Sequence, residues 1–285
     1  MSDGGDLSIR AATRAEFDLV VDWAAAEGWN PGRADGDLFH ATDPNGFLLG
    51  FIGGETVAAI SVVAYGAAFG FLGFYIVRPD FRGRGHGFRI WQAGMARLAG
   101  RTIGLDGVVD QQANYRKSGF VLAHRNIRYG GPVDAAAPEP ASGEVADATG
   151  LPFDTVAAYD APFFAGPRTA FLAHWLAAPG HVVKALLRDR RIAGYGVVRP
   201  CREGSKIGPL FADDAAAADD LFRALAAAAA AGPVFLDPPE PNREAVALAR
   251  RHGLAASFET ARMYAGPAPE LPLGRTYGIT TFELG

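Results

Sequence analysis

The chain has 285 residues, a formal net charge of −4 and 49% hydrophobic residues, which indicates a packed globular protein long enough for two domains. The slightly negative charge excludes a global field that would attract nucleic acid, and no apolar run reaches the roughly 20 residues that a membrane span needs. Cys201 is the single cysteine, which excludes an intrachain disulfide, and residues 1–6 lack a signal-peptide pattern, so we expect a cytoplasmic protein with no nucleic-acid or membrane partner.

The first half of the chain predicts alternating strands and helices. Thr13, followed by Glu16 three residues later, is a capping-box signature for the start of a helix. The pair Gly53-Gly54 between two apolar runs is typical of a tight β-hairpin. The expected strands cover residues 7–11, 47–52, 57–65, 69–77, 102–108 and 120–128, and the expected helices cover 14–28, 88–99 and 111–118.

The second half predicts the same order of elements as the first. Between the halves, residues 130–150 are rich in proline, alanine and small polar residues, which indicates a linker over 132–150. The repeated order indicates an internal duplication, so we expect domains over 1–131 and 151–285. The expected helices cover 168–176, 213–231 and 242–252, and the expected strands cover 181–188, 192–198, 206–211, 233–237, 258–264 and 277–284, with the last segment interpreted as an edge strand that returns to the first half.

The most informative motif is the turn Arg82-Gly83-Arg84-Gly85-His86-Gly87 between an expected strand and an expected helix. Glycines in such a turn let backbone N–H groups converge on an anion, and the helix N-terminus adds its positive dipole end. A P-loop would need Lys-Ser/Thr where Phe88-Arg89 stands, which excludes it. Asp106 has nearly the spacing of a Rossmann acidic residue, but the glycines run one position short and hairpin strands precede them, which argues against that fold.

Two motifs resemble those of the GNAT N-acetyltransferases. The pattern Arg82-x-x-Gly85-x-Gly87 is similar to the family's pyrophosphate loop, Gln/Arg-x-x-Gly-x-Gly/Ala. The stretch Tyr115-Arg116-Lys117-Ser118-Gly119-Phe120 is similar to its Tyr-x-x-x-Gly-Phe ending. The overall pattern resembles YitH-like GNAT proteins, in which a degenerate acetyltransferase-like domain follows the catalytic one. The stretches that carry this second resemblance are 27–32, 111–120, 206–213 and 262–264.

The resemblance implies a fold and a cosubstrate site. The implied fold class is α/β (α+β), with two tandem GNAT-like domains that each hold a mixed, mostly antiparallel sheet flanked by helices. Family members often carry Asn and Ala where this chain has Val108 and Gln111, which puts in doubt every cosubstrate contact from the expected helix 111–118 except that of Tyr115. The residues that the resemblance assigns to acetyl-CoA are Tyr75, Ile76 and Val77 for the pantetheine arm, Arg82, Gly83, Arg84, Gly85, His86 and Gly87 for the pyrophosphate, and Asn114 as a replacement contact.

The resemblance also implies catalytic and acceptor residues. Tyr115 is expected to protonate the leaving thiolate, and Asp106 is the candidate general base, with a plain turn carboxylate as its alternative. Trp29, Asn30 and Tyr65 are candidates for acceptor binding, with a packing role as the alternative. The histidines show no metal-ligand spacing, so no metal is expected. Charged residues that could reach an acceptor pocket from the second half, although turn, cap or surface roles explain most of them, are Asp160, Arg168, Asp237, Glu240 and Glu283.

The implied function is transfer of an acetyl group from acetyl-CoA to a primary amine by direct attack in a ternary complex. A small-molecule amine is favoured, because a second domain closing the cleft would restrict large acceptors. The alternative is a non-catalytic acyl-CoA-binding or sensor protein with the same fold. Asp213-Asp214 at the matching turn of the second half would repel a pyrophosphate, so one acetyl-CoA site per chain is expected. A homodimer is compatible with the sequence, although no motif requires one.

Overall fold

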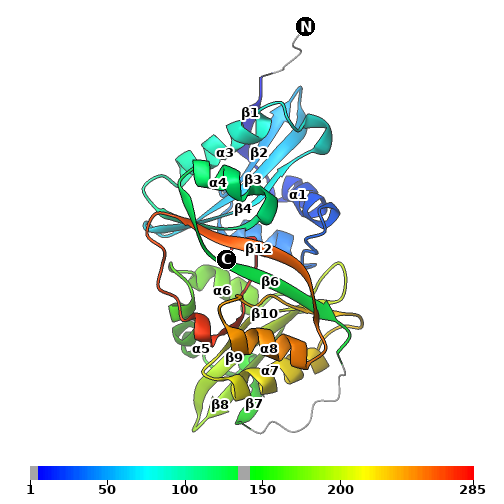
Figure 1. Cartoon of the computed structure of the whole chain (residues 1–285), viewed down its shortest axis with the longest axis vertical. Helices are drawn as coiled ribbons and strands as arrows, with labels where there is room; N and C mark the ends of the chain where they lie inside the picture. Colours follow the sequence, from blue (N-terminus) through cyan, green and yellow to red (C-terminus); the bar gives the residue numbers. More distant parts are fainter. Residues whose placement is uncertain (1–5, 134–141) are drawn as a thin grey trace.

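The computed structural model describes residues 6–133 and 142–285, and Figure 1 shows two halves stacked along the long axis of the molecule. The strands are β1 (Ser8–Ala11), β2 (Phe47–Ile52), β3 (Glu55–Tyr65), β4 (Phe69–Val77), β5 (Thr102–Val108), β6 (Phe120–Gly131), β7 (Glu144–Asp147), β8 (Val182–Arg188), β9 (Arg191–Pro200), β10 (Ser205–Ala212), β11 (Val234–Leu236), β12 (Ala255–Ala265) and β13 (Thr276–Gly278). The helices are α1 (Arg14–Ala26), α2 (Asp35–Thr42), α3 (His86–Arg97), α4 (Gln112–Lys117), α5 (Phe153–Asp160), α6 (Thr169–Leu176), α7 (Ala215–Ala227) and α8 (Arg243–Arg251).

The described strands form one thirteen-stranded sheet that passes through both halves. Its order is β1-β2-β3-β4-β5-β12-β6-β11-β10-β9-β8-β7, and β13 pairs with β10 beside this path. Among the described pairs, β4–β5 and β10–β11 are parallel and the others are antiparallel. The mixed, mostly antiparallel sheet flanked by helices that the sequence predicted is therefore confirmed.

The two halves exchange their last long strands. β12 of the second half lies between β5 and β6, with Arg262 opposite Asp106. β6 of the first half in turn pairs with β11, with Tyr129 opposite Leu236. Figure 1 shows these two strands crossing the middle of the molecule side by side, as their pairing requires. The domain ranges 1–131 and 151–285 thus follow the order of elements along the chain, while the sheet itself crosses that boundary in both directions.

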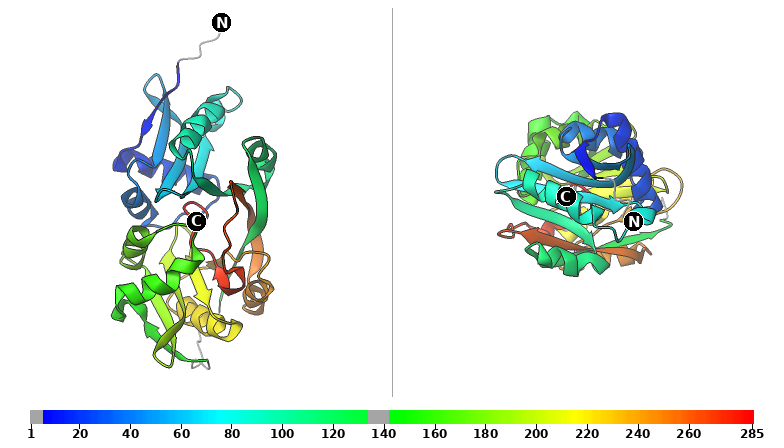
Figure 2. Two further views of the ribbon diagram at one scale, coloured as in Figure 1. Left: turned by 90° about the vertical axis from the view of Figure 1, so that its left-hand side faces the viewer. Right: turned by 90° about the horizontal axis from the view of Figure 1, so that it is seen from above.

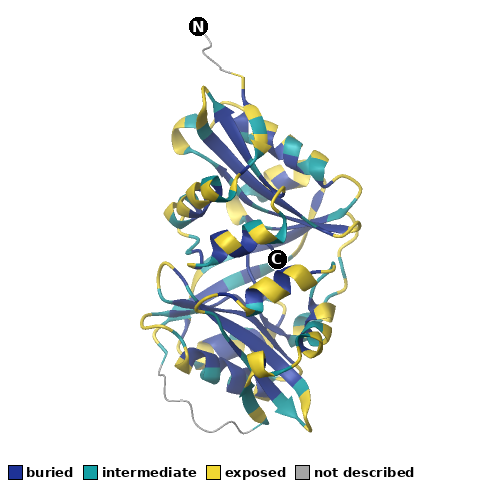
Figure 3. Ribbon diagram, turned by 180° about the vertical axis from the view of Figure 1, so that it is seen from behind, coloured by how far each residue is buried: buried dark blue, intermediate teal, exposed yellow. Residues whose placement is uncertain are grey.

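A shared core joins the halves. Helices α1 and α2 of the first half and α5 and α6 of the second contribute to one apolar cluster. Within it the rings of Phe39 and Trp175 stack with centroids 6.4 Å apart and planes within 3°. Two further clusters lie under α3 and under α7 with α8. Figure 3 shows the resulting pattern of buried strands beneath helices whose outer faces are exposed.

Several local predictions are confirmed, and others need correction. The capping box forms: Glu16 Oε2 accepts from Thr13 N at 2.9 Å, and Thr13 Oγ1 accepts from Glu16 N at 3.3 Å. The strand expected over 277–284 is wrong beyond Gly278, since β13 covers three residues only. The sequence analysis missed α2, α5 and β7, and β7 lies inside the expected linker because residues 144–147 find an antiparallel partner in β8. Residues 134–141 of that linker and residues 1–5 lie outside the described part of the chain.

Candidate active site

A cavity of about 440 Å³ opens beside β4 and is bordered by both halves of the chain. From the first half it takes the end of β4, the turn before α3, the end of β5 and Tyr115 of α4. From the second half it takes residues of β12 and of the segment 279–285. The residues that border it are Glu27, Trp29, 72–77, 81–83, Gly85, Gly87, Phe88, 105–108, Gln111, Tyr115, Phe258, Thr260, Phe282 and Glu283.

The cavity exists because β4 parts from β5. The parallel pairing of the two strands runs from Phe69 to Leu72 and then stops, while β4 continues to pair with β3 as far as Val77. An extra residue bulges β4 at this point, where Phe74 adopts a φ of 43°. Such a conformation costs a non-glycine residue about 1–3 kcal/mol and tends to persist at functional sites. The strand edge over 73–77 is consequently left facing the cavity.

The turn after β4 presents backbone N–H groups toward an anion site. Gly83 and Gly85 adopt φ values of 75° and 83°, which L side chains rarely reach, and Gly85 is the N-cap of α3. Within residues 6–133 and 142–285, no hydrogen bond is donated by the backbone N–H groups of Gly83, Arg84 or Gly85. The first N–H groups of α3 likewise have no acceptor inside the helix. The residues present therefore fit a phosphate-bearing ligand.

Gly87 serves a different purpose from the two glycines before it. A Cβ at this position would lie 2.7 Å from Tyr75 Oη and 3.1 Å from Val77 Cγ2. The missing side chain thus lets α3 approach the end of β4 closely. Nearby, Arg82 Nε donates to Val77 O at 2.8 Å, and its guanidinium pairs with Glu27.

Tyr115 is held rigidly against the cavity wall. Its ring stacks on Trp91 with centroids 5.4 Å apart, and Trp91 Nε1 donates to Ser118 Oγ at 3.0 Å. A Cβ at Gly107 would lie 2.2 Å from Tyr115 Cε2, so the ring occupies the space that a side chain on β5 would fill. Burial raises the pKa of Tyr115 well above its ordinary value, so the phenol keeps its proton at neutral pH. The side chain can therefore act as a proton donor.

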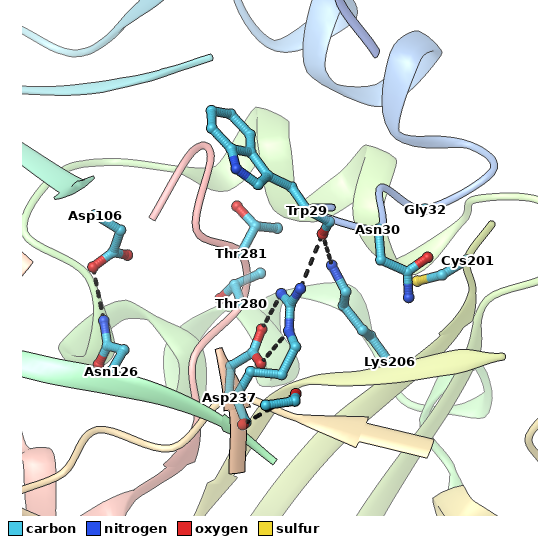
Figure 4. A network of polar contacts seen from close by, with 12 residues as sticks. Trp29, Asn30, Gly32, Asp106, Asn126, Cys201, Lys206, Asp237, Thr280 and Thr281 are labelled. Carbon is cyan, nitrogen blue, oxygen red and sulfur yellow. Dashed lines mark hydrogen bonds and ion pairs between the residues drawn. The ribbon is translucent and has the colours of Figure 1, made fainter. Parts of the chain in front are cut away.

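Asp106 also borders the cavity, but other side chains occupy its carboxylate. Arg262 Nε and Nη2 donate to its two oxygens at 2.9 and 2.6 Å, and Asn126 Nδ2 donates to Oδ1 at 2.8 Å. Figure 4 shows the contact with Asn126. Burial raises the pKa of Asp106, while the positive charge of Arg262 opposes the rise. The carboxylate thereby ties β5 to β6 and β12 across the exchanged strands.

The structure brings most of the predicted cosubstrate residues together. Tyr75, Ile76, Val77, Arg82, Gly83, Gly85 and Gly87 all border the cavity, as do Trp29 and Tyr115. Arg84 and His86 belong to the turn without bordering the cavity, and the Arg84 guanidinium lies 5.3 Å from the ring centroid of Phe81. The His86 side chain is buried, at 7% exposure, because it packs against Phe81 in the first turn of α3.

Three further predicted residues of the first half lie outside this cavity. Tyr65 is buried and its hydroxyl donates to Leu284 O at 3.0 Å, so it anchors the segment 279–285. Asn30 exchanges two hydrogen bonds of 2.9 Å with the backbone of Glu203. Asn114 donates to Gln111 on the surface of α4. Their proposed binding roles therefore rest on the resemblance and not on the cavity.

The sequence analysis missed the contribution of β12 and named only Glu283 from the segment that follows β13. Phe258 and Thr260 reach the cavity because of the strand exchange, and Phe282 reaches it through the segment that follows β13; no local sequence signal indicates either arrangement. Among the other charged candidates of the second half, Asp160 pairs with Arg168 and Asp237 with Arg128 in buried ion pairs. Glu240 pairs with Arg125 in a half-exposed one.

A buried polar network sits behind Trp29 (Figure 4). The backbone oxygen of Trp29 accepts from Arg128 Nη1 at 2.9 Å and from Lys206 Nζ at 3.1 Å. Burial lowers the pKa of Lys206 to about 8. Arg128 comes from the first half and Lys206 from the second, so the network fixes the position of Trp29 relative to both.

In the described ranges, no group of three or more His, Cys, Asp or Glu side chains is placed to hold a metal ion, and no described helix has the length and hydropathy of a membrane span.

Comparisons with known proteins agree with this geometry. Residues 14–120 match the acetyltransferase (GNAT) family, and residues 156–278 match a further acetyltransferase (GNAT) domain. The chain is 31% identical to holothin acyltransferase of a Pseudoalteromonas species over 277 residues, which cover 97% of this chain and 94% of that one. A crystal structure from Pyrococcus horikoshii, described as a candidate acetyltransferase, has a TM-score of 0.83 at 23% identity, with 100% of this chain and 98% of that one covered.

A tandem arrangement is also found among solved structures. A tandem GNAT protein from the clavulanic acid biosynthesis pathway has a TM-score of 0.64 at 16% identity, with 93% of this chain and 100% of that one covered. At these identities the solved structures show the shared fold alone, while the family matches and the relative cover both halves of the sequence. The chain therefore belongs to the GNAT family of acyltransferases and carries two GNAT domains in tandem.

Proposed function

We propose that the chain transfers an acetyl group from acetyl-CoA to a primary amine of a small molecule. The observation that carries the proposal is the continuous surface made by the open edge of β4 and the glycine turn that follows it. The unpaired N–H groups of the turn suit a pyrophosphate. The open strand edge suits the amides of a pantetheine arm, which can pair with it as an added strand does.

The residues around the cavity would supply positioning and proton transfer. Acetyl-CoA, when bound, would supply an activated thioester carbonyl. The edge over 73–77 and the turn would fix its two ends, so that an amine can attack without a covalent enzyme intermediate. Tyr115 would hold a proton for the leaving sulfur, since its raised pKa keeps the phenol neutral. The protein itself then needs no nucleophile.

Two observations support a small acceptor. The cavity volume of about 440 Å³ falls in the usual range for small-ligand sites, and residues of the second half form part of its wall. The relative that covers 97% of this chain is named for acyl transfer to holothin. We infer that an acceptor of similar size enters beside Trp29, whose position the network with Arg128 and Lys206 fixes.

A second candidate function is acyl-CoA binding without turnover. The engagement of Asp106 by Arg262 and Asn126 favours it, because a carboxylate that accepts three hydrogen bonds is a weak proton acceptor. Against it stands Tyr115, whose hydroxyl makes no hydrogen bond to another described residue and whose ring borders the cavity. A binding protein has no need for a phenol in that place.

The test separates binding from turnover. Calorimetry with acetyl-CoA should give one site per chain, and thiol release should follow the addition of holothin or of members of a panel of small primary amines. Binding without release for any amine would select the second candidate. Absence of acetyl-CoA binding would refute both functions.

A further inference from the structure

Among the described residues that border the cavity, three carry a carboxylate, and each of these carboxylates is already occupied or enclosed. Glu27 pairs with Arg82 of the turn. Asp106 accepts the three hydrogen bonds described above. Both oxygens of Glu283 are buried, and the residue as a whole is only 3% exposed. The cavity therefore offers no free carboxylate that could pair with an ammonium group or take its proton.

Other proton acceptors are also lacking at this cavity. None of the described residues that border it is a histidine or a lysine. Tyr75 and Tyr115 border it, but burial raises the pKa of both phenols, so they keep their protons at neutral pH. An ammonium group placed here would be a charge without a partner, which is costly away from water.

The buried charges behind Trp29 do not change this result. Each cation there faces an anion, in the pairs Arg128–Asp237, Arg199–Asp35 and Lys206–Glu283. Because the two signs balance, the network gives no net negative field that would draw a cationic acceptor into the cavity.

Aromatic residues from three distant segments meet at the same cavity. The rings of Phe258 and Phe282 lie 5.9 Å apart, and the guanidinium of Arg128 lies 5.8 and 4.8 Å from their centroids. The same guanidinium donates to Trp29 O, and Figure 4 shows the indole directed away from Lys206. Phe282 comes from the segment 279–285, which brings the end of the chain between the two halves (Figure 2). Since Trp29 and Phe258 are only partly buried, aromatic surface stays accessible at the cavity.

We propose that the acceptor is a weakly basic amine whose nitrogen is attached directly to a planar unsaturated ring, an inference that rests on the proposed function. Conjugation with the ring delocalises the nitrogen lone pair, so such an amine is neutral at pH 7 and needs no carboxylate. An alkylamine with a pKa near that of lysine, about 10.4, is neutral in only about one molecule in 10³ at that pH. The planar ring can lie against Trp29, Phe258 and Phe282, as aromatic groups do in offset-stacked or edge-to-face pairs.

The transfer to such an amine balances without a base in the protein. The nitrogen lone pair forms the N–C bond, and the C–S bond of the thioester breaks with its electron pair on sulfur. Tyr115 gives its proton to that sulfur. The proton that the acylated nitrogen loses goes to solvent, from which Tyr115 regains its own.

The test of charge measures amine binding by calorimetry to the full chain saturated with CoA, which carries no acetyl group. At pH 7, 4-methoxyaniline should bind at least about tenfold more tightly than 4-methoxybenzylamine, whose ring is the same but whose nitrogen is charged. Between pH 7 and 9 the Kd of the benzylamine should fall about tenfold per pH unit, because only its neutral form binds, and the Kd of the aniline should stay constant.

The test of the ring uses Phe258→Leu, which keeps an apolar side chain and removes the aromatic face. The Kd of 4-methoxyaniline should rise about threefold to tenfold. Phe51→Leu makes the same change on β2, outside the cavity, and should bind this amine as the wild type does. If Phe258→Leu does not fold, Phe282→Leu replaces it with the same expectation.

The outcomes separate this inference from the proposed function. Equal affinity for the two amines at pH 7, or a kcat/KM for 4-methoxybenzylamine that is constant between pH 6 and 8, would overturn it, because a protein group would then be accepting the ammonium proton. Unchanged affinity for 4-methoxyaniline in the phenylalanine variant would refute the role of the rings, and turnover of other amines without binding of 4-methoxyaniline would refute the substrate class. Failure of CoA to bind, or absence of turnover with every amine, would instead refute the proposed function.

Discussion

The two halves build the same turn in opposite ways. In the first half, β4 leads through Gly83 and Gly85 into α3, and no side chain caps the helix. In the second, β10 leads into α7 through Asp214, whose carboxylate accepts from Ala217 N at 2.9 Å and also pairs with Arg188. The hydrogen bond from Arg188 lowers the pKa of Asp214 to about 2, so the group is an anion at neutral pH. In the second half the Asp214 carboxylate therefore occupies the helix N-terminus, whereas in the first half the N-terminus of α3 is free to bind the anion of a ligand.

The strand edges next to these turns differ in the same sense. β4 parts from β5 after Leu72 and leaves its edge open. β10 parts from β11 after Ile207, but β13 pairs with β10 at Leu210 and Phe211 and covers the edge. The helix before the last strand completes the contrast, because Ala249 of α8 stands four residues before Gly253, as Tyr115 stands before Gly119. The first half therefore has an open strand edge and a tyrosine beside it, whereas in the second half β13 covers the corresponding edge and an alanine replaces the tyrosine.

The strongest way to break this comparison is to place an anion in the open turn. Gly85→Glu adds a carboxylate where the pyrophosphate is expected, at a φ of 83° that disfavours any side chain. We expect the Kd of acetyl-CoA, measured by calorimetry, to rise at least about 100-fold, which corresponds to about 2.7 kcal/mol.

Gly53→Glu is the matched control for that variant. Gly53 also has a positive φ, 58°, and a Cβ there also meets nothing within 4 Å, but it lies in the β2–β3 hairpin. It should bind acetyl-CoA as the wild type does. Unchanged affinity in Gly85→Glu would show that the turn does not hold the phosphates.

The second prediction removes from α4 the hydroxyl that has no counterpart at Ala249 of α8. Tyr115→Phe keeps the ring on Trp91 and removes the hydroxyl. We expect kcat for thiol release to fall about 100-fold, with the Kd of acetyl-CoA unchanged, because the leaving sulfur loses its proton donor. In the wild type, burial raises the pKa of Tyr115 above its ordinary value of 10.0, so ionisation of this phenol should not lower the rate below pH 10. A fully active Phe variant would show that Tyr115 is not the proton donor for the leaving sulfur.

The open turn was predictable from sequence, because its glycines serve local geometry. Gly83 and Gly85 are needed for positive φ and Gly87 for the approach of α3 to β4, and these needs leave a short pattern in consecutive residues. The alternation of strands and helices was predictable for the same reason, since each element carries its own periodicity.

The far wall of the cavity was not predictable in this way. Phe258 and Phe282 reach it through strand exchange and through a buried segment without regular structure, both of which depend on pairing between distant residues. Tyr65 illustrates the same limit, because its sequence position suggested the cleft and its hydroxyl instead holds Leu284. Local patterns specify elements, while the partner of each edge is decided by tertiary packing.

The third prediction sharpens the division of the cavity between cosubstrate and acceptor. Trp29→Ala removes a ring at the cavity wall but leaves the backbone oxygen that binds Arg128 and Lys206. We expect the KM of the acceptor amine to rise about tenfold, the value of an aromatic contact of about 1–1.5 kcal/mol, and the KM of acetyl-CoA to change less than about twofold. Steady-state kinetics with both substrates varied measures this. Equal changes in the two KM values would indicate a packing role for Trp29.

The smallest expected effect tests whether the second turn is closed by its carboxylate or by β13. Asp214→Ala removes the cap of α7 and the partner of Arg188, so the free energy of unfolding, measured by denaturant, should fall by about 1 kcal/mol. Asp147→Ala, which removes an exposed carboxylate 3.5 Å from Lys184, should stay within about 0.5 kcal/mol of the wild type. The number of acetyl-CoA sites should remain one per chain, because β13 still covers the edge of β10 in the variant. Binding of a second equivalent of acetyl-CoA by Asp214→Ala would mean that the Asp214 carboxylate alone prevents binding in the second half and that a ligand can displace β13 from the edge of β10.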